Sequence, residues 1–444
     1  MSDYKRTEYG NIPTDWNLET ILDIASNDVE NSFVDGDWVE SKYIENQGIR
    51  LIQTGNIGLG SFKEKNIKKY VSEESFDSLK CKEVVEGDIL ICRLADPIGR
   101  SCIVPNLGTK NITSVDVAIF RPEEAKYDKR FINYLLNSYK VLSKVQAFAS
   151  GTTRQRVSRK NLGTVRLPIP PIKKQQKITA IISSVDEAIE KTEQIITQTE
   201  KVKKGLMQQL LTKGIGHKKF KKTAVGEIPE SWEITDLTDI AKGDKYSFTG
   251  GPFGSDLTSK EYQSEGVRII QLQNIGEGDF FNSYKIYTSE EKADQLYKCN
   301  IYPGDIIIAK MAEPVARACL IPDFNERYLM ASDGIRLAVD EKKYDKYFIM
   351  NAINSPYFRK QAENNSTGTT RLRIGLKTLR KLKLAIPSFE EQQEIAKILI
   401  SFNEKIKLEE NQLQALQKLK KGLMQQLLTG KVRVPVDDEE VITS

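Results

Sequence analysis

An internal duplication is the strongest constraint on the fold of this 444-residue chain. The segment KGLMQQLLTKG at residues 204–214 returns as KGLMQQLLTGK at residues 421–431, a shift of 217 residues. A shift close to half the chain length indicates a duplicated domain, because solenoid repeats have periods of roughly 20–50 residues. Two similar modules in one chain tend to present two similar surfaces about a pseudo-twofold axis. We therefore expect the same activity at two places in the molecule.

The two copies correspond almost from end to end. YKRTEYGNIPTDW (4–16) matches FKKTAVGEIPESW (220–232), and GIRLIQTGNIGLG (48–60) matches GVRIIQLQNIGEG (266–278). EGDILICRLADPIGRSCIVP (86–105) matches PGDIIIAKMAEPVARACLIP (303–322), and SGTTRQRV (150–157) matches TGTTRLRI (367–374). These matches predict two modules of about 210 residues that share one fold.

Composition limits the class of protein. With 39% hydrophobic residues the chain is long enough for several cores. It has no apolar run near the ~18 residues of a membrane span, and MSDYKRTEYG does not resemble a signal peptide, so we expect a soluble cytoplasmic protein. The five cysteines include no CxxC pair, which predicts free buried thiols in a reducing compartment.

The first part of each copy reads as an α+β module. Short apolar runs at residues 89–92, 117–120, 306–309 and 335–339 are bounded by Gly, Pro and Asp, a pattern typical of strands joined by turns. Gly87 and Gly304 precede two of these strands and offer a permissive turn backbone. FINYLLNS and FIMNAINS have helical spacing. Strands and helices lack the regular alternation of a doubly wound sheet, which favours α+β.

The last forty residues of each copy have a helical pattern that differs from the α+β pattern before them. After PIPP (168–171) and IPS (386–388), proline is absent for about forty residues and apolar residues step by three and four, which predicts a helix roughly 60 Å long. The seam of each helix has the same heptad register in both copies. Its apolar positions are Ile178, Ile182, Val185, Ile189, Ile196, Leu206, Leu210, Ile395, Leu399, Phe402, Ile406, Leu413, Leu416, Leu423 and Leu427.

Chain order predicts that the two helices pack antiparallel on each other. A helix that leaves the first module must be met by a helix that returns from the second, because neither can bury its stripe alone. A weaker apolar row at Ile181, Ala188, Ile195 and Val202 has two explanations. It is either the edge of one broad stripe or a second seam for helices of another protein.

Basic residues are unevenly placed although the net charge is only +5. A solvated surface explains any single cluster, but matched clusters after GTT in both copies favour phosphate contact. The clusters are Lys63, Lys65, Lys68 and Lys69; Arg154, Arg156, Arg159, Lys160 and Arg166; and Arg371, Arg373, Lys377, Arg380, Lys381 and Lys383.

The ordered series of short strings resembles the specificity subunits of type I restriction-modification systems. The strings are G-x-I-P-x-x-W (10–16), Asn56-Ile57, GDIL (87–90), GTTR (151–154), a Pro-Pro break (170–171), Q-Q-x-I (175–178) and KGLMQQLLT (204–212), each with a second-copy equivalent. One departure is that Glu391-Gln392 stands in copy two where copy one has Lys174-Gln175. A polar contact of this glutamate is therefore in doubt for the first module.

The resemblance implies two target-recognition domains, each reading one half of a split double-stranded DNA sequence. The helices would act as a spacer and as the docking surface for two adenine-methyltransferase subunits, to which two motor-nuclease subunits are added if the system restricts DNA. The predicted order is target-recognition domain 1 (1–171), spacer helix 1 (172–213), a linker (214–219), target-recognition domain 2 (220–388), spacer helix 2 (389–430) and an acidic tail (431–444).

The candidate DNA-contacting residues are the basic and hydroxyl side chains that recur between the copies, joined by two lysines of the first cluster. Charge shared by modules that read different bases suits phosphate contact, whereas base choice requires side chains in a groove. The candidates are Lys63, Lys65, Arg93, Arg100, Thr152, Thr153, Arg154, Arg156, Lys310, Arg317, Thr369, Thr370, Arg371 and Arg373.

Base-reading residues are expected where the copies differ. Two such pairs of segments are residues 31–42 against 245–260 and residues 61–70 against 279–287. Neutral drift of surface loops explains these differences equally well. The sequence alone leaves both explanations open.

Catalytic chemistry is not expected in this chain. It has one histidine, His217, and no G-x-x-x-x-G-K-[ST] loop or Asn-Pro-Pro-Phe-like segment, so we expect no catalytic residue, metal or cofactor. The resemblance places S-adenosylmethionine, and ATP with Mg if the system restricts DNA, on partner subunits. Two alternatives stay open: a coiled-coil scaffold that joins two protein-binding modules, and a specificity subunit of a fused methyltransferase-nuclease system.

Overall fold

The structure is a computed structural model that describes residues 3–94, 96–151, 154–369 and 371–435. The chain forms two compact units. Unit 1 comprises Met1–Thr192 with Gln412–Ser444, and unit 2 comprises Glu193–Asn411. Each unit therefore holds one module and a stretch of both long helices, α6 (Ile172–Lys213) and α11 (Phe389–Leu427). The α+β class and the paired long helices are confirmed.

The module of unit 1 is built on two small sheets. An antiparallel sheet has the order β4-β10-β7-β8, and a mixed sheet has the order β6-β5-β9. The module begins with a hairpin, β1-β2. The next strand, β3, pairs with β11, the last strand of the module. The strands are β1 Tyr4–Thr7, β2 Gly10–Pro13, β3 Asn17–Thr20, β4 Phe33–Asp35, β5 Ile49–Ile52, β6 Lys69–Val71, β7 Ile89–Cys92, β8 Ser101–Ile103, β9 Asn111–Thr113, β10 Val117–Phe120 and β11 Arg166–Ile169. The helices before α6 are α1 Ile21–Ile24, α2 Glu73–Ser78, α3 Lys129–Leu136, α4 Tyr139–Ala147 and α5 Arg159–Gly163.

Unit 2 repeats this plan. Its sheets have the orders β15-β22-β19-β20 and β17-β16-β21-β18, with the hairpin β12-β13 and the pair β14-β23. The strands are β12 Phe220–Thr223, β13 Gly226–Pro229, β14 Glu233–Asp236, β15 Phe248–Gly250, β16 Val267–Ile270, β17 Ile286–Thr288, β18 Asn300–Ile301, β19 Ile306–Ala309, β20 Ala318–Leu320, β21 Tyr328–Met330, β22 Gly334–Leu337 and β23 Lys383–Ile386. The helices before α11 are α7 Glu290–Gln295, α8 Lys346–Ile353, α9 Pro356–Asn364 and α10 Leu376–Leu379.

Local sequence accounts for these elements. The apolar runs predicted as strands are the buried strands β7, β10, β19 and β22, and the turn glycines Gly87 and Gly304 both have φ of +85°. The aspartate of each Tyr-Asp-Lys string caps the helix that follows. Asp128 accepts from the Phe131 amide, and Asp345 accepts from the Phe348 amide. Such caps satisfy amides that the first helical turn leaves without partners.

The long helices bury the predicted seam within each unit. In unit 1, Ile178 and Ile182 of α6 share a core with Leu427, the last residue of α11, and with Leu428, which follows it. In unit 2, Leu210 and Leu211 share a core with Ile395 and Leu399. Each core thus joins the start of one helix to the end of the other, so the two segments in a unit run antiparallel. Every residue of the predicted seam is buried or half-buried.

The buried glutamine of the Q-Q-x-I string fastens each helix start to its module. In unit 1, Gln175 accepts from the Asp128 amide at 2.9 Å and donates to the Pro170 carbonyl at 2.8 Å. In unit 2, Gln392 accepts from the Asp345 amide at 2.9 Å and donates to the Pro387 carbonyl at 3.1 Å. Both side chains are 1% exposed, so these bonds satisfy groups that would otherwise be buried without partners.

The residue before this glutamine differs between the copies and so do its contacts. Glu391 accepts from Trp232 Nε1 at 3.1 Å, from the Ile215 amide at 2.9 Å, and lies 2.9 Å from His217 Nε2. In unit 1, Lys174 instead donates to Asp15 at 2.5 Å. The glutamate contact is therefore confined to unit 2, as the sequence suggested.

Unit 1 has an ion-pair network at the position of the Glu391 contacts. Arg433, beyond the end of α11, lies 3.4 Å from the Asp15 carboxylate. Burial acts to raise the pKa of Asp15, but the hydrogen bond and charge of Lys174, with the charge of Arg433, hold that pKa below its ordinary value. Lys174 and Arg433 thus take the place of the Glu391 contacts at this junction.

The five cysteines are free and buried, as predicted. Burial raises the pKa of the Cys102 and Cys319 thiols to about 12, so they behave as small apolar residues. Across the described ranges, no helix combines the length and the apolar character that crossing a bilayer requires.

The end of α11 is predicted to stabilise unit 1. We expect Leu427→Ala, at a side chain 3% exposed in the unit 1 core, to cost about 2–5 kcal/mol of unfolding free energy, because it leaves a cavity. Leu408→Ala is the matched control, since Leu408 lies on the same helix and is 66% exposed. Urea unfolding followed by circular dichroism measures both. Equal midpoints for the two variants would contradict this role of the helix end.

Candidate nucleic-acid interface

The GTTR segment of each module is a loop closed by its own backbone. Ser150 and Arg156 exchange two backbone hydrogen bonds of 3.0 and 2.9 Å, and Thr367 and Arg373 exchange two of 2.9 Å. The glycine at the start of each loop has a positive φ, +102° at Gly151. A Cβ there would meet the Arg154 carbonyl at 2.8 Å, so the loop requires glycine. Thr152, Thr153 and Thr370 lie outside the described residues.

Each loop is anchored to the end of a central strand. The Val157 amide donates to the Arg93 carbonyl at 3.0 Å, just after β7. The Ile374 amide donates to the Lys310 carbonyl at 2.9 Å, just after β19. The loop tips therefore have a fixed base on the sheet in both units.

The two arginines of each loop have different surroundings. Arg156 pairs with Asp116 at 3.0 Å, and Arg373 pairs with the corresponding Asp333 at 2.9 Å. Both pairs are partly exposed and add little stability by themselves, although they orient the loop. Arg154 and Arg371 are exposed at the tips. Within the described part of the chain, neither has a hydrogen bond or ion pair, so both guanidinium groups are available to an external anion.

Arg93 has an internal role. Its side chain is 4% exposed, pairs with Asp35 at 2.9 Å and donates to the carbonyls of Val157 and Val115. Burial lowers the pKa of Arg93, and the charge of Asp35 opposes that effect. Because these partners occupy the guanidinium inside the module, we exclude Arg93 from the proposed DNA surface.

Arg100 and Arg317 also have structural partners. Arg100 donates to the Ile57 carbonyl at 2.8 Å and to the Thr54 carbonyl at 2.9 Å. Arg317 donates to the Leu272 carbonyl at 2.9 Å. Both arginines therefore hold the short turn that follows β5 or β16. Their recurrence between the copies has a scaffold explanation, and they too are excluded.

The remaining candidates are more accessible. Lys63 and Lys65 are exposed, and the side chain of Lys63 lies against Gly58. Phe281 lies against Gly276 in the matching place of unit 2, so this lysine has no charged counterpart. Thr369 is exposed beside Arg371, and Lys310 is half-buried at the end of β19.

The structure also reveals surface residues that were not singled out in the sequence. Trp38 is 73% exposed and Phe253 is 82% exposed. They lie within 31–42 and 245–260, the first pair of segments in which the copies differ. Aligning FVDGDW with FTGGPF would have placed these aromatic residues at the same position. Composition and periodicity carry no such signal, because a single aromatic residue is usually assigned to a core.

No metal centre is found in the part of the chain that the structure describes, because no three His, Cys, Asp or Glu side chains there are placed to hold an ion. The neighbouring acidic residues Glu290 and Glu291 form the first turn of the short helix α7, which Ser289 caps. The arrangement that recurs in the two units is instead an exposed arginine on an anchored loop. Such an arrangement suits binding of a polyanion.

Comparisons with known proteins cover both modules of the chain. The model of the family described as type I restriction modification DNA specificity domain matches residues 27–201 and 229–418. A type I restriction enzyme specificity subunit of Methanocaldococcus jannaschii, MjaVIII, is 28% identical over 369 residues, with 81% of this chain and 83% of that protein covered. The putative MjaX specificity subunit of the same organism is 27% identical, with 97% of both chains covered.

Solved structures show the same fold at low identity. A chain from a structural study of complex assembly and conformational transition of the type I R-M system has a TM-score of 0.57 at 14% identity, with 95% of this chain and 99% of that chain covered. The S subunit of a type I restriction-modification system from M. genitalium has a TM-score of 0.55 at 17% identity, with 95% and 97% covered.

Substitution of the buried Arg93 is predicted to destabilise the protein, whereas substitution of the exposed Arg154 is not. Arg93→Met should lower the unfolding free energy by about 1–3 kcal/mol, because it leaves Asp35 and two carbonyls without their donor. Arg154→Ala should change it by less than about 0.5 kcal/mol, since its side chain is exposed. Urea unfolding of both variants checks this. An Arg93→Met protein as stable as the parent would show that the internal role is misassigned.

Proposed function

The chain belongs to the type I restriction modification DNA specificity family, and from this premise we propose that each of its modules contacts one half of a split double-stranded DNA sequence. It is a non-catalytic recognition component. The observation that supports the proposal best is the exposed arginine at the tip of an anchored loop in both units, Arg154 and Arg371, neither of which pairs with another described residue.

The proposed contacts are of two kinds. Arg154, Arg371 and the threonines of the GTT strings bind phosphates and set the position of each module, while other loops read bases. Arg156 and Arg373 contribute by orienting the loops through Asp116 and Asp333. Lys63, Lys65 and Lys310 add positive charge that attracts the duplex.

The proposed partners follow from the family. Two adenine-methyltransferase subunits dock on α6 and α11 and bind S-adenosylmethionine, and two motor-nuclease subunits with ATP and Mg join where the system restricts DNA. Val202 and Leu419, at matched positions of the two helices, are each 51% exposed and suit such docking. We propose that the protein is located in the cytoplasm, because its DNA target is there.

The scaffold alternative explains the helices but not the loops. Each of the two anchored loops presents an exposed arginine that has no hydrogen bond or ion pair to another described residue. An exposed guanidinium presents its N–H donors to a phosphate, and its recurrence in both units suits a duplex with two half-sites. We therefore favour the DNA-binding function over the scaffold.

Removal of the tip arginines is predicted to weaken DNA binding without changing sequence preference. In complex with the co-expressed methyltransferase, Arg154→Ala and Arg371→Ala should each lower the slope of log affinity against log salt by about 0.9, because each removes one phosphate contact. Fluorescence anisotropy of a labelled duplex over a salt series measures the slope. Lys360→Ala, which removes an exposed charge from α9, is the control and should leave the slope unchanged. If the parent complex does not bind duplex DNA, or binds it without salt dependence, the scaffold alternative is favoured.

A further inference from the structure

Trp38 and Phe253 occupy the same place in the two modules. Phe33 pairs with Phe120 in unit 1, and Phe248 pairs with Leu337 in unit 2. Three residues further on, the backbone makes the same hydrogen bond in both units. The Gly36 amide donates to the Val117 carbonyl, and the Gly251 amide donates to the Gly334 carbonyl, both at 2.8 Å. Counting two residues on from each glycine reaches Trp38 and Phe253.

The backbone before each aromatic residue is tightly held. A Cβ on Gly36 would lie within 2.5 Å of the Thr113 carbonyl oxygen. A Cβ on Gly251 would clash with the Ala331 carbonyl in the same way. Only glycine allows this close approach, so each loop is pressed onto the strand connection beside it. Asp37 adds a further anchor in unit 1, since it accepts from the Lys82 amide at 2.8 Å.

The same strand connection holds the arginine loop. In unit 1 it spans residues 114–116, receives Gly36 on one side, and pairs with Arg156 through Asp116. In unit 2 it spans residues 331–333 and pairs with Arg373 through Asp333. Each unit therefore mounts an exposed aromatic residue and an exposed arginine on loops attached to one connection.

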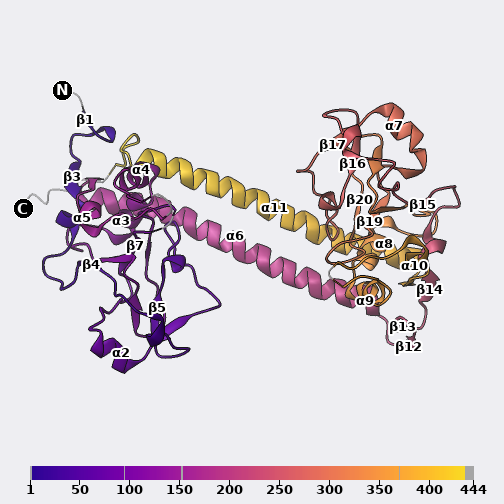
Figure 1. Cartoon of the computed structure of the whole chain (residues 1–444), viewed down its shortest axis with the longest axis horizontal. Coiled ribbons are helices and arrows are strands. Elements are labelled where there is room, and N and C mark those ends of the chain that lie inside the picture. Colours follow the sequence, from indigo (N-terminus) through magenta and orange to yellow (C-terminus); the bar gives the residue numbers. More distant parts are fainter. Residues whose placement is uncertain (1–2, 95, 152–153, 370, 436–444) are drawn as a thin grey trace, which may run out of the picture. The chain divides into compact units, whose positions relative to one another are not determined.

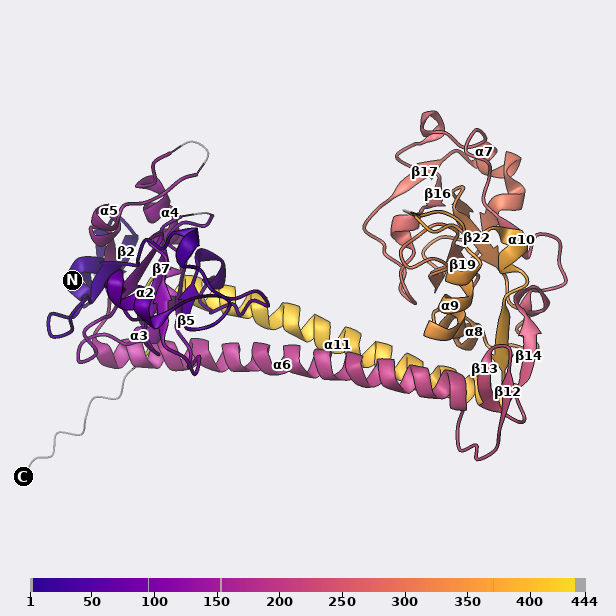
Figure 2. The same cartoon turned by 60° about the horizontal axis from the view of Figure 1, so that its bottom comes forward.

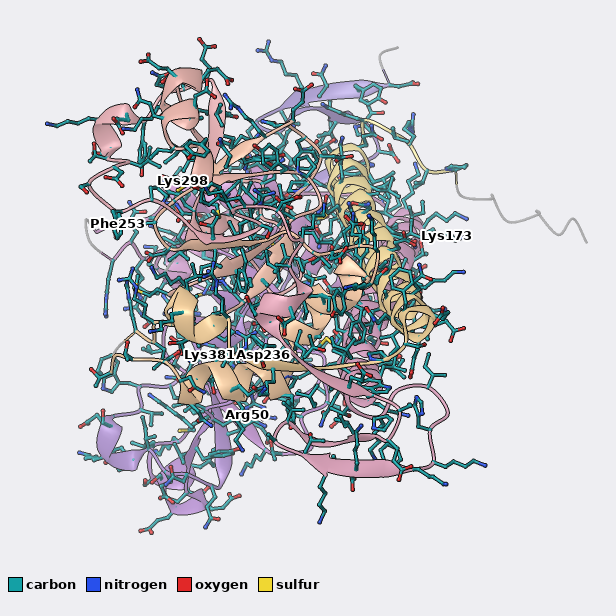
Figure 3. All side chains as sticks on the ribbon, turned by 90° about the vertical axis from the view of Figure 1, so that its right-hand side faces the viewer. Arg50, Lys173, Asp236, Phe253, Lys298 and Lys381 are labelled. Carbon is teal, nitrogen blue, oxygen red and sulfur yellow. The ribbon has the colours of Figure 1, made fainter. Side chains whose placement is uncertain are left out.

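The surroundings of the aromatic residue differ in charge between the two units. In unit 2 the Cys299 thiol donates to the Gly250 carbonyl at 3.7 Å, which places Lys298 beside β15. Figure 3 shows Phe253 and Lys298 at the same edge of this unit. In unit 1, Lys82 pairs with the carboxylate of Asp37, the neighbour of Trp38, at 2.5 Å, so this pair adds no net charge. In unit 2 the exposed ring follows a strand that has a lysine beside it, which suits nucleic acid better than an apolar protein face.

We infer that Trp38 and Phe253 contact bases of the two half-sites, and this inference rests on the proposed DNA-binding function. An indole or phenyl ring reaches a base in two ways, by apolar contact with a thymine methyl in the major groove or by insertion at a base step. The supporting glycines are the same in both modules while the aromatic residue differs. This is the pattern expected where one scaffold presents different readers to different half-sites.

Substitution of each aromatic residue tests the base contact. In the complex with methyltransferase, Trp38→Ala and Phe253→Ala should each weaken binding to the duplex that the complex methylates by about tenfold or more, a typical loss for a base-contacting aromatic residue. Binding to a duplex without that sequence should change by less than about twofold. The matched controls are Tyr139→Ala (81% exposed, unit 1) and Phe324→Ala (60% exposed, unit 2).

Tryptophan fluorescence gives a second readout. The chain has three tryptophans, and Trp16 and Trp232 are 3% and 0% exposed, so Trp38 is the accessible one. The difference between parent and Trp38→Phe complexes isolates its signal from tryptophans of the partner. We expect acrylamide to quench this signal in the complex alone, and expect the methylated-sequence duplex to protect it.

The outcomes separate this inference from the proposed function. Unchanged affinity of Trp38→Ala and Phe253→Ala, with normal DNA binding by the parent, overturns the base contact and leaves the function in place. Protection of Trp38 by the methyltransferase before DNA is added assigns the ring to a protein interface and also overturns it. Failure of the parent complex to bind DNA refutes both.

Discussion

The apolar closure between the end of one long helix and the start of the other is the interaction on which each module depends. Unit 1 is the clearer case, because Leu427 and Leu428 come from the far end of the sequence and complete a core that begins with Tyr9 and Ile12. The burial of such side chains contributes about 1.5–3 kcal/mol each. The first module is therefore incomplete until the second helix has been made.

The G-x-I-P-x-x-W string of each module packs where the two long helices share a core. In unit 1 a Cβ on Gly430 would meet Pro13 at 2.3 Å, and Trp16 lies 3.4 Å away. In unit 2 a Cβ on Gly214 would meet Trp232 at 2.9 Å. Both glycines have positive φ and lie where the tryptophan packs. Gly214 directly follows α6, and Gly430 lies in the turn after α11. This explains why the duplication keeps G-x-I-P-x-x-W and the KGLMQQLLT segment together.

Much of the fold could be predicted from the sequence because it depends on periodicity and on repeated strings. The heptad seam, the buried strands such as β7 and the helix α3 after Tyr-Asp-Lys follow from patterns that are local in the chain. The pairing of β5 with β9 could not be predicted in this way. Those strands are parallel and separated by about sixty residues, and nothing in their local sequence specifies the partner.

The candidate site was less predictable for a physical reason. An arginine that binds phosphate and an arginine that ties two loops together have the same sequence signature, and only burial and partners separate Arg154 from Arg93 and Arg100. Recurrence between the copies did not help, because a shared scaffold preserves its internal arginines as well. The exposed ring of Trp38 was missed for the opposite reason, since aromatic residues usually indicate a core.

The central claim is that two modules with the same scaffold read two different half-sites. Sequencing of methylated bases in genomic DNA from cells that carry this chain and its methyltransferase partner tests it most directly. The account predicts one split motif with a methylated adenine in each half, since each unit has its own arginine loop and its own aromatic residue. A continuous motif, or no motif while the partner is active, would contradict it.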